Sequence, residues 1–302
     1  MTLARGVSLF VLVLCAWSLQ GSDVQASVES AVREIELCLE RPPATFLDAV
    51  VIANRLAQPE LKRDDVEKSI RSMASKVRRS MGSRSTAEEQ LDALREVIFE
   101  REGFYAPEMP APLTEGKALN YYALPSVLRK KVAYCEGLSL VFALVGREAG
   151  LNVSVLRAPA HVYCRFQSGS QTVNIECTAG GRETSEDELI QNSGAKPAAR
   201  FSGVYFCELT SRGILALQLN SVSYNLITHK SHRRILSPDQ WKRIASVLLR
   251  LQPDDPETLN TAATIYLMTD DRFTAEMLHR RTLDQVKFFG APDVLKAGLE
   301  KR

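Results

Sequence analysis

Apolar residues recur every three or four positions from residue 27 to residue 103, with charged residues between them. This spacing predicts helices, and prolines or glycines separate one helix from the next. The predicted helices cover residues 28–40, 46–57, 64–80 and 86–101. A proline-rich connector follows at 104–117. We therefore expect a helical N-terminal region over residues 27–117, without chemistry of its own.

The segment after Cys135 keeps the helical spacing but is apolar on nearly every side. Leu138, Val141, Phe142 and Val145 lie at offsets of 3, 4 and 7 from the first of them. A helix that is apolar all round is buried. Cys135 then lies at its N-terminus, where unpaired backbone N–H groups and the helix dipole favour the thiolate, the nucleophilic form of cysteine.

The next segment predicts two strands on either side of a turn-like stretch of serine, glycine and glutamine. With Ser168 and Gly169 as a two-residue loop, His161 pairs with Glu176 and apolar residues face apolar residues. A slip by one residue would mix the polar and apolar faces. The sequence therefore predicts that His161 and Glu176 are neighbours across the strands, with Cβ atoms about 5 Å apart.

A cysteine at a helix N-terminus, a histidine and a carboxylate are the parts of a nucleophilic site when they meet in space. We assign Cys135 as the nucleophile, His161 as the general base and Glu176 as the group that orients the imidazole. Each residue alone has a simpler explanation: a buried apolar thiol, a satisfied histidine, a solvated strand glutamate. Their joint placement favours catalysis over these explanations.

Two further hypotheses concern the same neighbourhood. Asn120 is a candidate donor to an oxyanion, although an asparagine that caps a helix is the commoner arrangement. Zinc held by Cys135, His161 and Glu176 is a weaker alternative to catalysis, which metal analysis of the purified protein tests. We expect no metal and no other cofactor.

Three sequence blocks carry a family resemblance: YCEGLSLVFALVGREAGL at 134–151, APAHVYCRF at 158–166 and NIECTAGG at 174–181. They resemble the core of the transglutaminase-like superfamily, and more narrowly its bacterial branch related to the SirB regulator proteins. The resemblance covers roughly residues 45 to 285. It implies an α+β fold of papain type, in which a buried cysteine-bearing helix packs on a small antiparallel sheet.

The same resemblance implies a cysteine hydrolase or acyltransferase that acts on amide or peptide bonds of a peptide or protein substrate. In such an enzyme Cys135 forms an acyl-enzyme, which water hydrolyses or an amine converts to a new amide. The alternative is a catalytically idle module that binds or assembles with another protein. The lead-in Val132-Ala133-Tyr134 motivates this alternative, because a glycine is common there in the family.

The C-terminal part is again helical in pattern. Residues 209–226 and 239–251 predict helices, and a unit of about 34 residues begins at Pro256. The seam positions of a tetratricopeptide-like helix pair are occupied by Leu259, Ala263, Tyr266 and Ala275. Since one such unit is not stable alone, we expect 209–302 to dock on a core at 118–208. A groove in this tail that binds a protein partner is a further hypothesis, and structural packing is the commoner explanation.

The first 26 residues predict a secretory signal peptide. Arg5 supplies a basic start, Val7 to Leu19 an apolar stretch and Val24-Gln25-Ala26 a small-residue cleavage site. Cleavage after Ala26 implies a secreted or periplasmic protein. The apolar stretch is too short to span a bilayer comfortably, and no later segment is long and apolar enough to do so, so we expect no stable membrane span.

The net charge and the number of cysteines bear on nucleic-acid binding and on disulfide formation. A formal net charge of +2 gives no electrostatic footprint for nucleic acid. Five of the six cysteines follow the leader, an odd number, so at least one thiol stays free even in an oxidising compartment. In the predicted register Cys164 and Cys177 lie too far apart for a disulfide. Two alternatives remain from the sequence: a disulfide between Cys38 and Cys207, or no disulfide at all.

Overall fold

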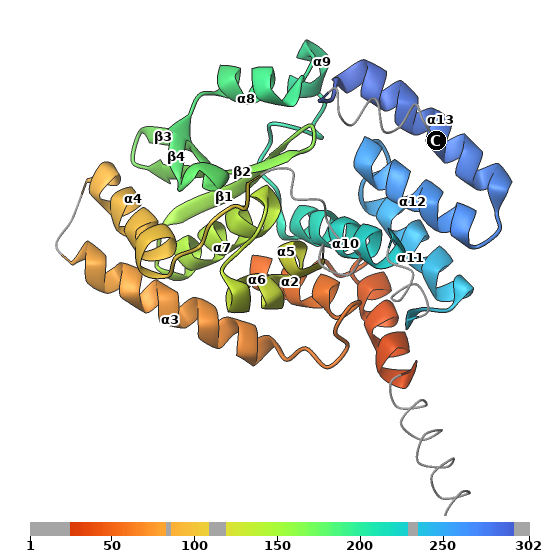
Figure 1. The fold of residues 1–302 in the computed structure, drawn as a ribbon, viewed down its shortest axis with the longest axis horizontal. Coiled ribbons are helices and arrows are strands. Elements are labelled where there is room, and N and C mark those ends of the chain that lie inside the picture. The colour runs from red at the N-terminus through yellow and green to blue at the C-terminus, as the bar shows by residue number, and fades with distance from the viewer. Residues whose placement is uncertain (1–24, 83–85, 109–118, 229–234, 293–302) are drawn as a thin grey trace, which may run out of the picture.

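The structure, a computed structural model, describes residues 25–82, 86–108, 119–228 and 235–292. Its fold is α+β, with helices around one small antiparallel sheet (Figure 1). This confirms the fold class expected from the sequence. The predicted signal peptide, apart from its last two residues, lies outside the described residues, as do residues 109–117 of the predicted connector. In the described part of the chain, no helix is long and apolar enough to cross a membrane.

The N-terminal helices lie within a few residues of their predicted positions. They are a helix at 25–37, α2 (Phe46–Asn54), α3 (Arg63–Met81), α4 (Ala87–Arg95) and a π-helical turn (Glu96–Arg101). Capping boxes fix two of the starts: Thr45 exchanges hydrogen bonds with Asp48, and Thr86 with Glu89. Each box satisfies backbone N–H groups that a helix start leaves unpaired.

Three helices lead into the centre of the molecule: α5 (Leu119–Tyr122), α6 (Leu124–Lys130) and α7 (Cys135–Glu148). Helix α7 begins at Cys135, as predicted, and its residues from Leu138 to Val145 are at most 5% exposed. It packs against β1 and β2. The apolar surface on all sides of α7 therefore has a physical cause, because α3, α6 and the sheet surround it.

The sheet has four strands in the order β1-β2-β3-β4, each antiparallel to its neighbour. They are β1 (Asn152–Ala158), β2 (His161–Ser168), β3 (Gln171–Glu176) and β4 (Arg182–Thr184). The sequence predicted only β2 and β3. All of β1 except Asn152 is buried, although its sequence alternates polar and apolar residues from Asn152 to Val155. Strand β4 has three residues, too few for a pattern.

The predicted register of the β2–β3 hairpin is wrong by two residues. Cys164 pairs with Ile175 and Ser168 with Gln171, so the loop is Gly169-Ser170. The first loop position requires a positive φ in the favoured hairpin turns, and Gly169 supplies it with φ 59°. A slip of two residues keeps every side chain on its face of the sheet. His161 and Glu176 therefore stay on the same face, diagonal to one another.

The same shift overturns the expectation that Cys164 and Cys177 are far apart. Both thiols are buried, and Cys164 is a close enough neighbour to affect the pKa of Cys177. Burial and this neighbour raise the pKa of Cys177. All five described cysteines, including Cys38 and Cys207, are free thiols.

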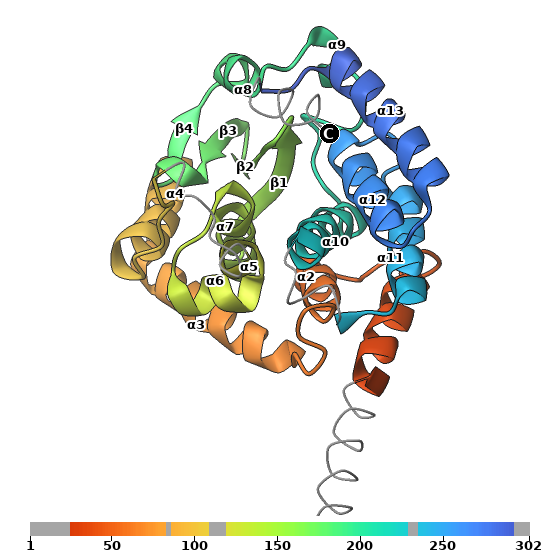
Figure 2. The same ribbon diagram turned by 45° about the vertical axis from the view of Figure 1, so that its right-hand side comes forward.

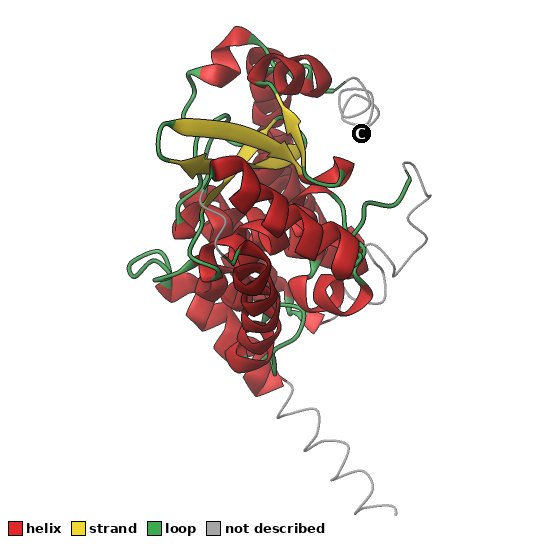
Figure 3. Cartoon of the chain, turned by 90° about the vertical axis from the view of Figure 1, so that its left-hand side faces the viewer, coloured by secondary structure: helices red, strands yellow, loops and turns green. Residues whose placement is uncertain are grey.

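Both faces of the sheet are covered. Val153, Val155 and Phe166 face α7 and belong to a core that continues into the N-terminal helices. On the other face Leu156 and Tyr163 pack with the short helices α8 (Glu186–Ser193) and α9 (Pro197–Arg200). Figure 3 shows the sheet in yellow with most of the helices on one side of it.

The C-terminal helices pack on the core and are not separate from it. They are α10 (Ser211–Thr228), α11 (Pro238–Leu251), α12 (Pro256–Met268) and α13 (Arg272–Phe289). Helix α10 packs against α2, α5 and α12. Figure 2 shows α2 and α10–α13 together on the side of the molecule opposite α3 and α4.

Candidate active site

Cys135 occupies the first position of α7, with its side chain partly exposed and its thiol free. No side chain caps this helix start, so the first-turn N–H groups point outward without an intrahelical partner. Gly137, in the same turn, lets the helix approach its neighbours closely. A Cβ built there would lie 2.7 Å from the Ala133 Cβ and 3.0 Å from the Tyr121 carbonyl oxygen.

His161 and Glu176 are in direct contact. His161 Nε2 lies 2.6 Å from Glu176 Oε2, and the other carboxylate oxygen accepts hydrogen bonds from the backbone N–H and the hydroxyl of Thr178. The carboxylate is therefore held at the end of β3 while it engages the imidazole. Because Nε2 faces the carboxylate, Nδ1 is the nitrogen left for another partner.

The charge state of His161 depends on both neighbours. Burial lowers the pKa of His161, but Cys135 and Glu176 outweigh this effect and raise the pKa to about 10. For Glu176 burial raises the pKa, and the bonds from His161 and Thr178 bring it below its ordinary value of 4.5. His161 thus contacts Glu176, and Cys135 lines the same cavity as His161.

Asn120 lies on α5, near the start of that short helix. It is not among the residues that line the cavity containing Cys135; Tyr122, two residues later, is. Burial, with the nearby Cys135 and Glu136, raises the pKa of Tyr122 above its ordinary range, so this phenol stays a hydrogen-bond donor. A role for Asn120 toward an oxyanion stays a prediction.

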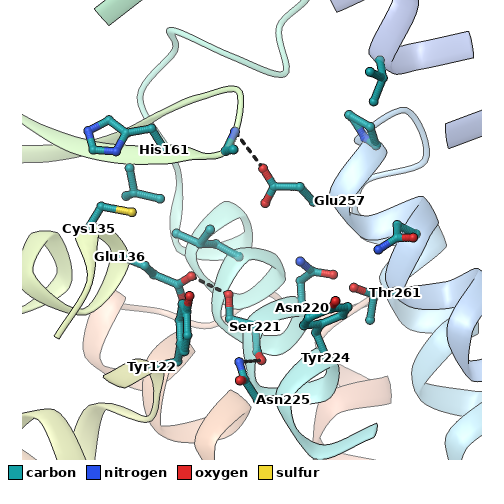
Figure 4. Close-up of a pocket in the computed structure, with 16 residues that line it drawn as sticks. Tyr122, Cys135, Glu136, His161, Asn220, Ser221, Tyr224, Asn225, Glu257 and Thr261 are labelled. Carbon is teal, nitrogen blue, oxygen red and sulfur yellow. Dashed lines mark hydrogen bonds between the residues drawn. The ribbon is translucent and has the colours of Figure 1, made fainter. Parts of the chain in front are cut away.

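Cys135 and His161 open into a cavity of about 310 Å³ between α7, α10, the β1–β2 turn and the start of α12 (Figure 4). Its lining includes polar residues that sequence reasoning did not select. They are Tyr122, Glu136, Asn220, Ser221, Tyr224, Asn225, Glu257, Asn260 and Thr261. Most come from elements far along the chain from Cys135, which is why local patterns did not indicate them. Glu136 had one visible signal, a charge at the start of an otherwise apolar helix.

Glu136 is 4% exposed and holds α7 to α10. Gln218 Nε2 donates to one carboxylate oxygen at 2.7 Å, and the Ser221 hydroxyl donates to the other. Gln218 also accepts from Asn54 on α2 and donates to the Tyr122 carbonyl. Burial raises the pKa of Glu136 to about 8, although the Ser221 bond opposes this shift. The carboxyl group is thus poised to titrate near neutral pH.

A buried ion pair fixes the wall of the cavity that α12 provides. Arg157 on β1 and Asp255, before α12, are 2% and 1% exposed and lie 3.0 Å apart. Arg157 also contacts Glu257, whose other oxygen accepts from the Ala160 backbone N–H at 3.0 Å. Ala160 has φ 55°, an unusual conformation for a non-glycine residue, and it directly precedes His161. The start of α12 therefore supports the turn that presents the imidazole.

No group of three or more histidine, cysteine or acidic side chains in the described ranges has an arrangement that would hold a metal ion. This includes Cys135, His161 and Glu176. His229 and His232 lie outside the described residues.

Comparison with protein families supports the same interpretation of the core. The model of the transglutaminase-like superfamily matches residues 64–220, from α3 into α10. No curated protein matches the chain closely enough to count as a relative.

Among solved structures, the chain is similar to menin, in a crystal structure described as revealing the binding site for the Mixed Lineage Leukemia (MLL) protein. The TM-score is 0.52 at 12% identity. The match covers 86% of this chain and 61% of the menin chain. At this identity the likeness concerns the fold alone, and the chain spans less than two thirds of menin.

Proposed function

The chain belongs to the transglutaminase-like superfamily, and on that premise we propose that it is a cysteine hydrolase or acyltransferase acting on amide or peptide bonds. The observation that carries the proposal is the hydrogen bond of 2.6 Å between His161 and Glu176, beside a cavity that Cys135 and His161 both line. This arrangement supports the papain-type cycle, in which the carboxylate keeps the imidazole in the orientation that proton transfer needs.

In the proposed reaction the Cys135 thiolate attacks the carbonyl carbon, and the electron pair of the C=O bond moves to oxygen. Backbone N–H groups at the start of α7 are placed to stabilise that oxyanion, and Tyr122 and Asn120 are candidate additional donors. Collapse of the intermediate expels the amine, which takes its proton from the His161 imidazolium. Water, or a second amine, then gives a proton to His161 and displaces the sulfur, which yields the acid or the new amide.

We further propose that the protein acts in the periplasm or outside the cell, after removal of residues 1–26. The basic start, apolar stretch and small-residue site at its beginning support this. N-terminal sequencing of the exported protein tests it: a first residue of Ser27 is expected, and retention of Met1 would contradict it.

The finer family placement is also a proposal: kinship with the SirB-related branch, and a tetratricopeptide-like pair in α12 and α13. In support of the latter, Leu259, Ala263 and Ala275 are buried and Tyr266 packs against the core. These are the residues expected at the seam of such a pair.

Alkylation by iodoacetamide at about pH 6 tests the catalytic proposal. An ordinary thiol has a pKa near 8.5 and is mostly unreactive there. We expect Cys135 to react at least about tenfold faster than Cys207, the other partly exposed thiol, and Glu176→Gln to reduce that advantage. The exposed Glu40 offers a matched control, Glu40→Gln, which leaves both rates unchanged. Equal rates at Cys135 and Cys207 in the wild-type protein would reject the proposal.

A second candidate function is a catalytically idle module that binds a protein. It is favoured by the likeness of the fold to menin, whose structure is described as revealing a binding site for another protein. A pull-down with Cys135→Ala protein separates the two candidates. A partner retained at full affinity, together with no acyl adduct on wild-type Cys135, would favour the binding module.

A further inference from the structure

Helix α13 carries large apolar side chains on two opposite faces. One face is buried against the rest of the molecule and consists of Ala275, Leu278, Thr282, Val286 and Phe289. On the other face Phe273, Met277 and Phe288 are 75%, 50% and 59% exposed. A surface helix normally has one apolar stripe, which faces the core. The exposed stripe therefore indicates a second packing surface.

The exposed side chains lie along one line of the helix. Successive helical residues are about 100° apart around the axis, so positions 273, 277, 280, 284 and 288 project from the same side. All five side chains are exposed, and we call them the outer stripe: Phe273, Met277, Arg280, Asp284 and Phe288. Single exposed apolar residues are common, whereas several on one strip mark an interaction surface.

The outer stripe also lies at the end of a series of packed helices. Helices α10, α11, α12 and α13 each pack on the next, and Figure 2 shows α13 at the edge of the molecule, outside α12. The last helix of such a series usually has a polar outer surface, which keeps the end of the series soluble. The apolar side chains on the outside of α13 are the opposite arrangement. They indicate that another helix packs there.

The order of the residues makes the outer stripe complementary to itself. Two copies of α13 can lie antiparallel about a two-fold axis at the level of residue 282. Arg280 of each copy then faces Asp284 of the other, and Met277 faces Phe288. Opposite charges meet twice at the centre, and apolar side chains meet on both sides of them. The pattern therefore favours a second copy of this chain as the partner over an unrelated helix.

The exposed surface is large enough for a weak dimer. Burial of the five side chains from each copy removes on the order of 1,000 Å² of surface in total, the lower limit for a specific interface. Phe273 extends the contact beyond Met277 at both ends. We expect an interface of this size to give a transient dimer, with a Kd in the micromolar range.

We propose that the outer stripe of α13 is an interface between two copies of this chain, related by a two-fold axis. Such an isologous interface uses the same surface on both copies, which is what a self-complementary stripe provides. The inference goes beyond the proposed function and is independent of it. Helix α13 lines the cavity beside Cys135 with Val286, which belongs to its buried face, so the outer stripe faces away from the candidate active site.

Sedimentation velocity over protein concentrations from about 1 to 300 micromolar measures the association. We expect a reversible change from monomer to dimer, and Met277→Asp should raise the Kd at least about tenfold because it places a charge in the apolar contact. Leu37→Asp is the matched control, since Leu37 is an apolar residue 59% exposed on the first helix. It should leave the Kd unchanged. A monomer at every concentration, or a dimer that Met277→Asp does not weaken, would overturn the interface.

Exchanging the central charges tests the two-fold arrangement itself. Arg280→Glu alone, or Asp284→Arg alone, sets like charges against one another in a dimer and should raise the Kd at least about tenfold. In an equimolar mixture of these two variants every introduced charge faces an opposite charge. The mixture should therefore associate with a Kd within about threefold of the wild-type value. Single variants that dimerise normally, or a mixture that stays monomeric, would contradict the proposed pairing. Circular dichroism confirms that each variant is folded.

Discussion

At the scale of single residues, burial of the Glu136 carboxyl group opposes its ionisation. The carboxyl group is buried beside the proposed nucleophile, and its hydrogen-bond donors, Gln218 and Ser221, are neutral. Burial raises its pKa from 4.5 to about 8, against the effect of Ser221. Between these two pH values the folded protein keeps a proton that the unfolded chain has lost.

Glu136→Gln should reveal this proton as a pH-dependent change in stability. A raised pKa means that the contribution of Glu136 to stability is fully present below about pH 4.5 and is lost as the pH rises through about 8. The slope is about 1.4 kcal/mol per pH unit at most. Glutamine does not titrate, so the free energy of unfolding of the variant should rise relative to wild type from about pH 5 to 8 and then level off. Urea unfolding at several pH values measures it, and a difference that is constant across this range would contradict the prediction.

The sequence predicted part of the candidate site at this scale. Cys135 was recognisable from the helix that follows it, and His161 and Glu176 from the strand pattern. Asn220 and Glu257 were not, because they reach the cavity from helices whose packing is set by tertiary contacts. Glu136 was overlooked because a charge in the first turn of a helix usually faces water.

At the scale of elements, the first turn of α7 depends on a close approach at Gly137. The Cβ position there lies 2.7 Å from the Ala133 Cβ and 3.1 Å from Val127 Cγ2. A side chain at this position must push the start of α7 away from α6 and from the lead-in to Cys135. The position of the Cys135 sulfur therefore depends on the lack of a side chain at Gly137.

Gly137→Ala should destabilise the protein by about 1–3 kcal/mol, the usual range for overpacking, and slow alkylation of Cys135. Gly213→Ala is the matched control, since the three atoms nearest to its Cβ would all belong to the flexible Leu209 side chain, the nearest at 3.2 Å. There alanine should stabilise α10 by up to about 1 kcal/mol and leave alkylation unchanged. Thermal unfolding with parallel alkylation rates checks both. Normal stability and reactivity in Gly137→Ala would show that the close packing is unimportant.

Helices and strands were predictable to different degrees for a physical reason. Helical spacing is local, so α3 and α7 begin within one residue of their predicted positions. The hairpin register depends on which residue adopts a positive φ. The prediction placed Ser168 at the first loop position, whereas in the structure Gly169 lies there. The contact between His161 and Glu176 survived, because side-chain facing repeats every two residues.

At the scale of the whole molecule, the C-terminal helices complete the site. Arg157 on β1 reaches Asp255 across 98 positions of sequence, and Glu257 bonds the turn before His161. The tail at 209–302 therefore supports the imidazole through buried charge. Sequence patterns predicted that these helices would dock on the core. They could not predict that Arg157 pairs with Asp255, because that contact depends on tertiary packing.

Arg157→Met should destabilise the protein by about 3–5 kcal/mol, because it leaves the buried Asp255 carboxylate uncompensated. Arg182→Met is the comparison. It breaks an exposed pair with Glu188 and should change stability by less than about 1 kcal/mol. Urea unfolding of both variants measures the difference. Similar small effects would mean that the Arg157 pair does not hold α12 to the sheet.

The protonation state of His161 tests the account most directly, because it reports on the sulfur and the carboxylate at once. The chain has four histidines, so ¹⁵N NMR can follow the imidazole of His161 through a pH titration. In wild-type protein we expect an imidazolium that persists well above pH 7, since its pKa is raised to about 10. Cys135→Ala and Glu176→Gln should each lower that pKa by a unit or more. A wild-type His161 that titrates near the ordinary value of about 6.5, unaffected by Cys135→Ala, would contradict the proposed active site.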